Sequence, residues 1–401
     1  MSASLSARLR FHPYSRRFRS ALFTPLGVWS SRLGLVVRLE AGDRVAYGDI
    51  TPIPWFACES FDEAFQFCSR WRGPVTEETI AAIPATLPAT RFGLGWAWEQ
   101  LQGHPWGASH PAEGAKGSGG CDRADDQLLD PTLGDSPQPH GIPGNTALDP
   151  AQPNQNQLHI LPSLPLGWLL PQGNRALDAW QDPWDQGWRT FKLKVGDGSW
   201  EQELTRIETL RRGLPEGGQL RLDANGKLTL EQAHQLLALG DRLGEQGYPL
   251  EFVEQPLPPE AWMDLQALER TYATPIALDE SVTTVTQLRH CQDQGWGGIF
   301  VLKPSLAGFP WEVRALWEDR GQEGGAHNLG KSGLDLVMSS ALETAIGHQA
   351  AMTLAHQWHQ QSHAPRAAGL GVQGFLEQDG LDSPTAGEVW KFVNFLGVGV
   401  G

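Results

Sequence analysis

The fold is decided by five short apolar runs: TFKLKVG at 190–196, QLRLDANG at 219–226, PLEFVEQPL at 249–257, TPIALDES at 274–281 and GGIFVLKPS at 297–305. Helical patterns separate these runs, and the same rhythm extends over residues 158–385. Strands and helices that alternate in this way are typical of βα units and a parallel sheet. An open doubly wound sheet is the alternative, but it would normally carry a Gly-rich phosphate turn after its first strand. No such turn follows the first predicted strand, so the pattern favours a closed α/β barrel.

Three further segments differ from the barrel in composition. Residues 1–102 combine strand-like runs with helical patterns and predict an α+β unit. Residues 103–157 are rich in Gly, Pro, Asp, Gln and Asn and contain few large apolar side chains. This composition predicts a disordered, low-complexity insertion. We expect the C-terminal residues 386–401 to return to the N-terminal unit.

The overall charge limits the possible partners. The 401 residues include 46 acidic and 31 basic side chains, which gives a formal net charge of −15. This balance argues against binding to nucleic acid or to an anionic membrane surface. A small anionic carboxylate substrate remains compatible with it, because local charge at a site can oppose the global charge. The sequence leaves the oligomeric state open.

Cysteine usage and the N-terminus bear on the compartment. The four cysteines form no CxxC pair, which predicts reduced thiols and a cytoplasmic protein. No apolar run approaches the length of a membrane span. The first acidic residue is Glu40, and several arginines precede it. A transit peptide is therefore an alternative to an ordinary β-meander in this region.

Charged residues occur where the predicted strands end. Lys192 and Lys194 are two residues apart, so both point to the same side of their strand. Helices cover the outer face of a barrel strand, and we therefore expect both lysines to face the barrel mouth. Buried lysines are costly unless anionic groups accompany them.

Three carboxylates supply those anionic groups. Asp223, Glu254 and Asp279 lie at successive strand ends, which meet at one face of a barrel. Three acids in a poorly solvated mouth would repel one another unless a cation lay between them. Oxygen ligands on a rigid frame suit Mg²⁺, with Mn²⁺ as a possible substitute. Lys194 and Lys303 are then expected on opposite sides of this metal site. A lysine next to a metal-held carboxylate substrate can remove the proton α to that carboxylate.

Five motifs at matching spacing resemble the enolase superfamily, in the branch of the muconate-lactonizing enzymes. They are KLK at 192–194, LDANG at 222–226, VEQPL at 253–257, LDES at 278–281 and LKPS at 302–305. The resemblance implies a modified (β/α)7β TIM-like barrel at 158–385 and an α+β capping domain with lid loops at 1–102. It also implies roles for the residues at the strand ends. Asp223, Glu254 and Asp279 would bind the metal, Lys194 would be the general base, Lys192 would support it, Lys303 would act from the opposite face, and Asn225 and Glu280 would lie beside the metal ligands.

Within this branch the chain resembles the o-succinylbenzoate synthase family most. The matching segments are SSALET at 339–344, GLG at 369–371 and the cap sequence over 24–60, although Asp49 stands where that family usually has Glu. This resemblance implies Mg²⁺-dependent syn-dehydration of 2-succinyl-6-hydroxy-2,4-cyclohexadiene-1-carboxylate to 2-succinylbenzoate, in menaquinone or phylloquinone biosynthesis. An N-acylamino-acid racemase, or another cycloisomerase or epimerase of the branch, is the alternative. A catalytically inactive barrel with a scaffold role is a third hypothesis.

Several smaller signals concern substrate contact. Ser339 and Ser340 are candidates for binding a substrate carboxylate, and small residues needed for close packing are the alternative. Thr24 and Phe56 lie in expected lid loops, where Phe56 could equally be a core residue. A lid that excludes water is needed for a carbanion-like intermediate. We interpret the late histidines, His348, His356 and His359, as part of the helix after the seventh strand and not as metal ligands.

Overall fold

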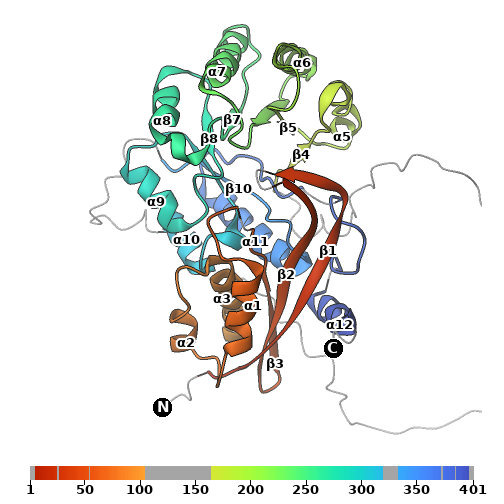
Figure 1. Ribbon diagram of the computed structural model, residues 1–401, viewed down its shortest axis with the longest axis vertical. Helices are drawn as coiled ribbons and strands as arrows, with labels where there is room; N and C mark the ends of the chain where they lie inside the picture. Colours follow the sequence, from red (N-terminus) through yellow and green to blue (C-terminus); the bar gives the residue numbers. More distant parts are fainter. Residues whose placement is uncertain are drawn as a thin grey trace, which may run out of the picture.

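The computed structural model describes residues 5–24, 27–53, 55–103, 164–318, 333–371, 374–383 and 385–396. In these residues a parallel barrel occupies one end of the molecule and a smaller cap occupies the other (Figure 1). Beyond Gly103, the insertion predicted at 103–157 lies outside the described residues. None of the described helices is long and apolar enough to cross a membrane.

The barrel is built on seven parallel strands in the order β10-β9-β8-β7-β6-β5-β4. Neighbouring strands follow one another along the chain, as expected for consecutive βα units. The predicted barrel is confirmed. The strands are β4 (Gly167–Leu169), β5 (Thr190–Lys194), β6 (Gln219–Asp223), β7 (Phe252–Glu254), β8 (Ile276–Leu278), β9 (Ile299–Leu302) and β10 (Leu336–Met338).

Isolated bridges close the barrel where an eighth strand would lie. Ala368 pairs in parallel with Leu166, just before β4, and Gly369 pairs in parallel with Ser339, just after β10. Residues 368–369 therefore join the two edges of the sheet. A closed sheet leaves no unpaired strand edge. The strand ends thus form a complete ring.

Helices surround the sheet and bury its outer face. Leucines, isoleucines and phenylalanines of the strands pack against the apolar faces of these helices in one large core. Capping residues in the sequence mark where these helices begin. In α7, for example, Thr229 caps the helix, and its side chain accepts a hydrogen bond from the backbone of Gln232. The α-helices are α5 (Gln181–Asp185), α6 (Trp200–Gly213), α7 (Leu230–Glu245), α8 (Trp262–Thr271), α9 (Val285–Asp293), α10 (Pro310–Glu318) and α11 (Ala345–Gln361), and the short 3-10 helices are η1 (Gly173–Leu177), η2 (Pro259–Ala261) and η3 (Pro304–Leu306).

The cap consists of an antiparallel sheet in the order β1-β2-β3 and three helices. Its strands are β1 (Arg8–Thr24), β2 (Gly27–Ala41) and β3 (Arg44–Ile50), and its helices are α1 (Phe61–Arg70), α2 (Glu77–Ala81) and α3 (Pro88–Gln102). Helix α3 lies close to β3 where two glycines meet. A Cβ atom added to Gly48 would come within 1.9 Å of the Gly93 carbonyl oxygen, so this approach requires glycine.

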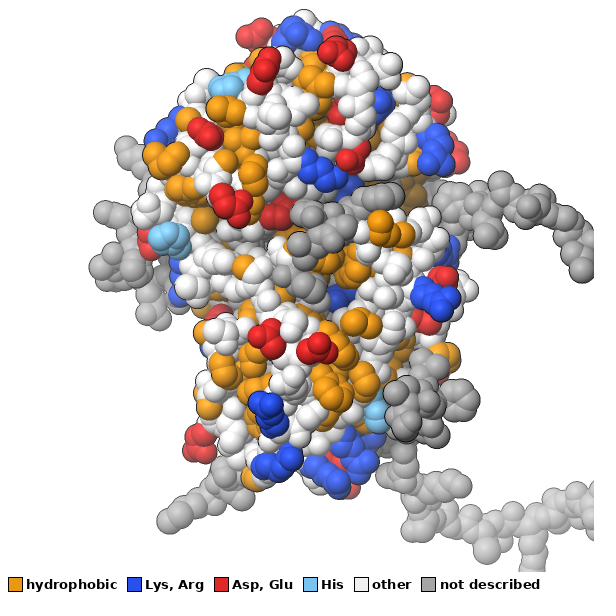
Figure 2. All heavy atoms as spheres, viewed as in Figure 1, with side chains coloured by type: hydrophobic (Ala, Val, Ile, Leu, Met, Phe, Trp, Pro, Cys, Tyr) orange, Lys and Arg blue, Asp and Glu red, His pale blue; other side chains and the backbone are white. Residues whose placement is uncertain are grey.

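The cap and the barrel share their cores. Phe92 and Trp96 of α3 pack in the barrel core, and Leu306, Phe309 and Ala341 of the barrel pack in the cap core. Helix α12 (Ala386–Leu396) returns to the cap, where Val389 and Trp390 pack with residues of β1 and β2. The far end of the β1–β2 ribbon reaches the barrel near β4 (Figure 1). On the face shown in Figure 2, acidic and basic side chains are mixed over the barrel, and basic ones gather at the end of the cap.

Candidate active site

A pocket lies at the carboxyl ends of the barrel strands, beneath the cap. Its volume is about 190 Å³. The barrel supplies charged lining residues, including Lys192, Lys194, Asp223, Asp279, Glu280 and Lys303. The cap ribbon and its following loop supply apolar side chains, namely Leu22, Trp29, Ile53, Trp55 and Phe56. The pocket therefore has a charged floor and an apolar wall.

Lys192 lies at the centre of the floor. Its Nζ atom is 3.0 Å from Asp223 Oδ2 and 2.6 Å from Glu254 Oε1. Burial acts to lower the pKa of Lys192, but the charges of Asp223 and Glu254 outweigh burial and the pKa lies above its ordinary value. Lys192 is therefore held as a cation between two carboxylates from the neighbouring strand ends of β6 and β7.

The carboxylates respond unequally to this environment. Burial acts to raise the pKa of Asp223, but Lys192 and Lys194 outweigh it and the pKa lies below its ordinary value. Burial, and then the charge of Asp223, raise the pKa of Glu254 to about 7. The negative charge of the carboxylates in the site is therefore only partly compensated by the lysines.

Lys194 contacts the cluster through an amide. Its Nζ atom donates to Asn225 Oδ1 at 3.1 Å, and Asn225 Nδ2 donates to Glu280 Oε1 at 3.1 Å. Asn225 has a left-handed backbone, with φ of 46°, and its backbone amide donates to Asp223 Oδ1 at 3.2 Å. Asn225 and Glu280 thus lie beside the carboxylate cluster, and their role next to a metal stays a prediction.

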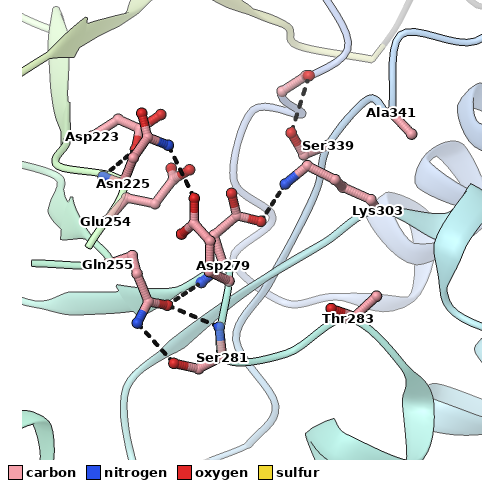
Figure 3. A network of polar contacts seen from close by, with 12 residues as sticks. Asp223, Asn225, Glu254, Gln255, Asp279, Ser281, Thr283, Lys303, Ser339 and Ala341 are labelled. Carbon is pink, nitrogen blue, oxygen red and sulfur yellow. Dashed lines mark hydrogen bonds and ion pairs between the residues drawn. The ribbon is translucent and has the colours of Figure 1, made fainter. Parts of the chain in front are cut away.

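Lys303 lies on the far side of the pocket from Lys194. Figure 3 shows its ammonium directed at Asp279, with which it forms an ion pair and hydrogen bond. The strand ends of β5 and β9 carry the two lysines, and β6, β7 and β8 lie between those strands. A substrate in the pocket would thus meet one lysine on each side.

The donor set suits a divalent cation. The Oε2 atom of Glu280 is buried and lacks a hydrogen-bond partner among the described residues. Burial, and then the charges of Asp279 and Asp223, raise the pKa of Glu280 to about 8. In the described ranges, no group of three His, Cys, Asp or Glu side chains is arranged to hold a metal ion. The ammoniums of Lys192 and Lys303 pair with the carboxylates of the cluster. A hard cation at this point would compete with the ammoniums for these oxygens.

Gln255 is a site residue that the sequence analysis missed. It is fully buried and has φ of 38°. Its Oε1 atom accepts hydrogen bonds from the backbone amides of Asp279 and Ser281 at 3.0 and 3.1 Å (Figure 3). Gln255 therefore joins the end of β7 to the end of β8. The sequence feature that could have indicated Gln255 is an amide side chain directly after Glu254 in an apolar run.

Ser339 and Ser340 both line the pocket, but their hydroxyls differ in availability. The Ser340 hydroxyl donates to Glu343 Oε2 at 2.5 Å, so it is occupied. The Ser339 hydroxyl lies 3.5 Å from the Gly369 carbonyl oxygen, a weak contact that a ligand could displace (Figure 3). Glu343 also accepts a hydrogen bond from the Ser305 hydroxyl at 2.6 Å. It is a second residue near the pocket that the sequence did not indicate.

Of the two predicted lid residues, Thr24 and Phe56, only Phe56 has a described side chain. Thr24 ends β1, and its side chain lies outside the described part of the structure. Phe56 lines the pocket and its ring lies under the Lys303 ammonium, with Nζ 4.0 Å from the ring centre. The late histidines lie on or beside α11, as predicted.

Family comparisons agree with this fold and site. Residues 175–380, about half of the chain, match a family model described as enolase C-terminal domain-like. Residues 20–101 match a model described as the N-terminal domain of MenC. A capped barrel with lysines on both sides of a carboxylate cluster thus has the architecture of an enolase-superfamily enzyme.

Relatives narrow the class further. The chain is 33% identical to the o-succinylbenzoate synthase of Thermosynechococcus vestitus over 386 residues, which cover 96% of this chain and 98% of that one. A crystal structure of the o-succinylbenzoate synthase from Thermosynechococcus elongatus, complexed with Mg in the active site, superposes with a TM-score of 0.69 at 33% identity and covers 92% of this chain and 94% of that one. The chain belongs to the o-succinylbenzoate synthase family of the enolase superfamily, a family of hydro-lyases.

More distant matches support the fold alone or cover only part of the chain. A muconate lactonizing enzyme from Pseudomonas fluorescens superposes with a TM-score of 0.64 over 94% of this chain and 90% of that one, but at 17% identity it supports the fold alone. The N-succinylamino acid racemase of Thermus thermophilus is 32% identical over 164 residues. That match covers 41% of this chain and 39% of the racemase.

Proposed function

We propose that this chain catalyses the syn-dehydration of 2-succinyl-6-hydroxy-2,4-cyclohexadiene-1-carboxylate to 2-succinylbenzoate, a step of menaquinone or phylloquinone biosynthesis. The observation that carries the proposal is the similarity to an o-succinylbenzoate synthase along nearly the whole of both chains. The placement of Lys194 and Lys303 on either side of the carboxylate cluster supports it.

The carboxylate cluster is the proposed metal site. Asp223, Glu254 and Asp279 would hold Mg²⁺, and Mn²⁺ is a possible substitute. When bound, the cation would draw electron density from the substrate carboxylate and so make the neighbouring C–H bond more acidic. The raised pKa values of Glu254, about 7, and Glu280, about 8, support a site that gains from added positive charge.

Lys194 is the proposed acid and base. Its neutral amine takes the proton from C1 of the substrate, and the electron pair of the C–H bond moves into the carboxylate to form an enediolate. The enediolate then expels the hydroxyl group at C6, which receives the same proton from the Lys194 ammonium and leaves as water. Removal and return on one face make the elimination syn. Asn225 supports this role, because its amide oxygen accepts a hydrogen bond from Lys194 Nζ.

The other two lysines would act by charge. Lys303 remains a cation on the opposite face and stabilises the negative charge of the enediolate, with a cation–π contact to the developing aromatic ring. Lys192 would stay an ammonium beside Asp223 and Glu254, where its positive charge reduces the repulsion between the two carboxylates. Ser339 is the better placed of the two serines to contact a substrate carboxylate, since the Ser340 hydroxyl is taken by Glu343.

A direct assay tests the proposal. Purified protein is added with Mg²⁺ to the cyclohexadiene substrate, and aromatisation is followed by ultraviolet absorbance with an EDTA control. We expect rapid conversion that EDTA abolishes. Absence of conversion by folded, metal-loaded protein would contradict the proposed dehydration.

Racemisation of N-succinylamino acids is the second candidate, because the Thermus racemase matches part of the chain and two opposed lysines would serve a two-base reaction. Incubating each enantiomer of an N-succinylamino acid in D₂O distinguishes the two functions. Racemisation that is faster than dehydration would favour the alternative.

Compartment and domain limits are also proposals. We place the enzyme in the cytoplasm, and the free thiols of Cys58, Cys68 and Cys291 among the described residues are compatible with a reducing compartment. The boundaries proposed for the cap, insertion, barrel and C-terminal segment remain 1–102, 103–157, 158–385 and 386–401. The proposed partner is a small carboxylate substrate, and neither nucleic acid nor a membrane is expected to bind.

A further inference from the structure

The ring of Phe56 and the ammonium of Lys303 form a contact between the cap and the barrel. Lys303 Nζ lies 4.0 Å from the centre of the Phe56 ring. Both groups are shielded from water, since Phe56 is 5% exposed and the Lys303 side chain is 11% exposed. A cation over an aromatic face is attracted by the negative face of the ring, and the attraction grows as water is excluded.

The loop that carries Phe56 is fastened in place. The Phe56 amide donates to the Ile53 carbonyl at 2.9 Å, and the Cys58 thiol donates to the same carbonyl at 3.0 Å. The buried Arg32 donates to the Pro52 carbonyl at 2.7 Å in the cap and to the Ala341 carbonyl at 3.0 Å in the barrel. The ring is therefore held at a defined position relative to the barrel mouth.

Among the residues that the structure describes, the other strong partner of Lys303 is the carboxylate of Asp279. In the proposed function the oxygens of Asp279 hold a divalent cation, which repels the ammonium and competes for those oxygens. Of the two described contacts of Lys303, the one with the Phe56 ring would then remain. Because the ring carries no formal charge, it can hold the ammonium without drawing it away from a negatively charged substrate.

We propose that Phe56 is a positioning residue that keeps the Lys303 ammonium directed at the substrate. This inference rests on the proposed function, in which Lys303 stabilises the enediolate. Ordinary core packing is the competing explanation for a buried phenylalanine. Leucine preserves most of the apolar bulk but lacks the ring face, so F56L separates the two explanations, and F56Y restores the ring.

The test compares F56L and F56Y with the parent protein in turnover and in ligand binding. We expect F56L to lower kcat about thirtyfold, which is the size of effect expected for a desolvated cation–π pair. Affinity for 2-succinylbenzoate, measured by calorimetry, should change little, and F56Y should recover most of the turnover. Labelling of amines with acetic anhydride, read by mass spectrometry in the presence of Mg²⁺, should modify Lys303 faster in F56L than in the parent or F56Y.

Phe309 offers a matched control. The guanidinium carbon of Arg91, in the cap, lies 4.1 Å from the centre of the Phe309 ring, in the barrel. Phe309 is 2% exposed and does not line the pocket. F309L thus removes a cap-to-barrel cation–π pair of the same kind, and we expect it to lower the melting temperature without lowering kcat.

Three results would overturn the inference, and they differ in what else they imply. If F56L keeps the parent kcat while K303A abolishes turnover, Phe56 only packs and the proposed function stands. If F56L and F309L lower kcat equally, loosening of the cap explains the effect. If K303A itself retains turnover, the proposed role of Lys303 fails, and the role of Phe56 fails with it.

Discussion

Asp223, Glu254 and Asp279 are buried acids that face lysine ammoniums, and this residue-scale pairing makes the site sensitive to single changes. Removing one member of a buried charge pair leaves the other uncompensated. Replacing a carboxylate with its amide keeps the shape and removes both a proposed metal ligand and a compensating charge.

The first prediction concerns these three acids. We expect D223N, E254Q and D279N each to raise the Mg²⁺ concentration needed for half-maximal activity by at least about tenfold, since each removes a charged oxygen ligand. A Mg²⁺ titration of turnover, accompanied by calorimetric titration of Mg²⁺, measures the effect. Unchanged Mg²⁺ dependence in all three variants would contradict the proposed metal site.

The second prediction concerns Gln255, which the sequence did not reveal. Q255A would leave the amides of Asp279 and Ser281 without their acceptor. The cost is about 1–3 kcal/mol for the buried Asp279 amide and less for the partly buried Ser281 amide. We expect a lower melting temperature and weaker Mg²⁺ binding. Gln266 is a matched control, because it is also buried and donates to the Gln294 carbonyl at 2.7 Å outside the site. Q266A should lower stability and leave Mg²⁺ affinity unchanged, and equal Mg²⁺ affinity in both variants would refute the role of Gln255.

At the scale of elements, the sequence pattern predicted which side of a strand its side chains face, but it did not predict their long-range contacts. Alternation placed Lys192 and Lys194 on the inner side of β5, because a strand covered by helices can direct charges only inward. Local spacing alone was less informative in α1. Ala64, Phe65 and Cys68 share the spacing typical of one apolar helix face, but Phe65 is 37% exposed. Glu343 accepts the Ser340 hydroxyl across a turn in which Leu342 has φ of 60°, and no local sequence pattern predicts this contact.

The third prediction concerns the junction between β3 and α11. Asp49 accepts hydrogen bonds from the Thr344 amide and hydroxyl at 2.8 and 2.7 Å and from the Tyr14 hydroxyl at 2.9 Å. Burial nevertheless raises the pKa of Asp49 from 3.8 to about 6. Between these values the folded state keeps a proton that the unfolded state has lost, so the contribution of Asp49 to stability is complete below pH 3.8 and is lost as the pH rises through 6.

This shift corresponds to about 3 kcal/mol across that pH window. Urea unfolding of the parent and of D49N between pH 4 and 7 measures it. We expect the stability of the parent relative to D49N to fall as the pH rises, because only the parent titrates at this position. A difference between the two proteins that is independent of pH would contradict the raised pKa.

At the scale of the whole molecule, the cap completes a site that the barrel begins. The five strand-end motifs were sufficient to predict the barrel and to bring the lysines and acids to one mouth, because parallel strands end at a common face. The sequence could not show that Trp29 and Trp55 form the apolar wall, or that the Phe56 ring lies under Lys303. These contacts join segments far apart in the chain, and they depend on how the cap docks on the barrel.

The central claim is that Lys194 moves the proton in a dehydration that aromatises the substrate. The most direct test is the rate of 2-succinylbenzoate formation by K194A at saturating Mg²⁺, compared with the parent, after circular dichroism and calorimetry have verified the fold and Mg²⁺ binding. We predict that turnover falls by at least about a thousandfold, as expected when the group that carries the proton is removed. A K194A protein that keeps most of the parent rate would exclude Lys194 as the base and contradict the proposed mechanism.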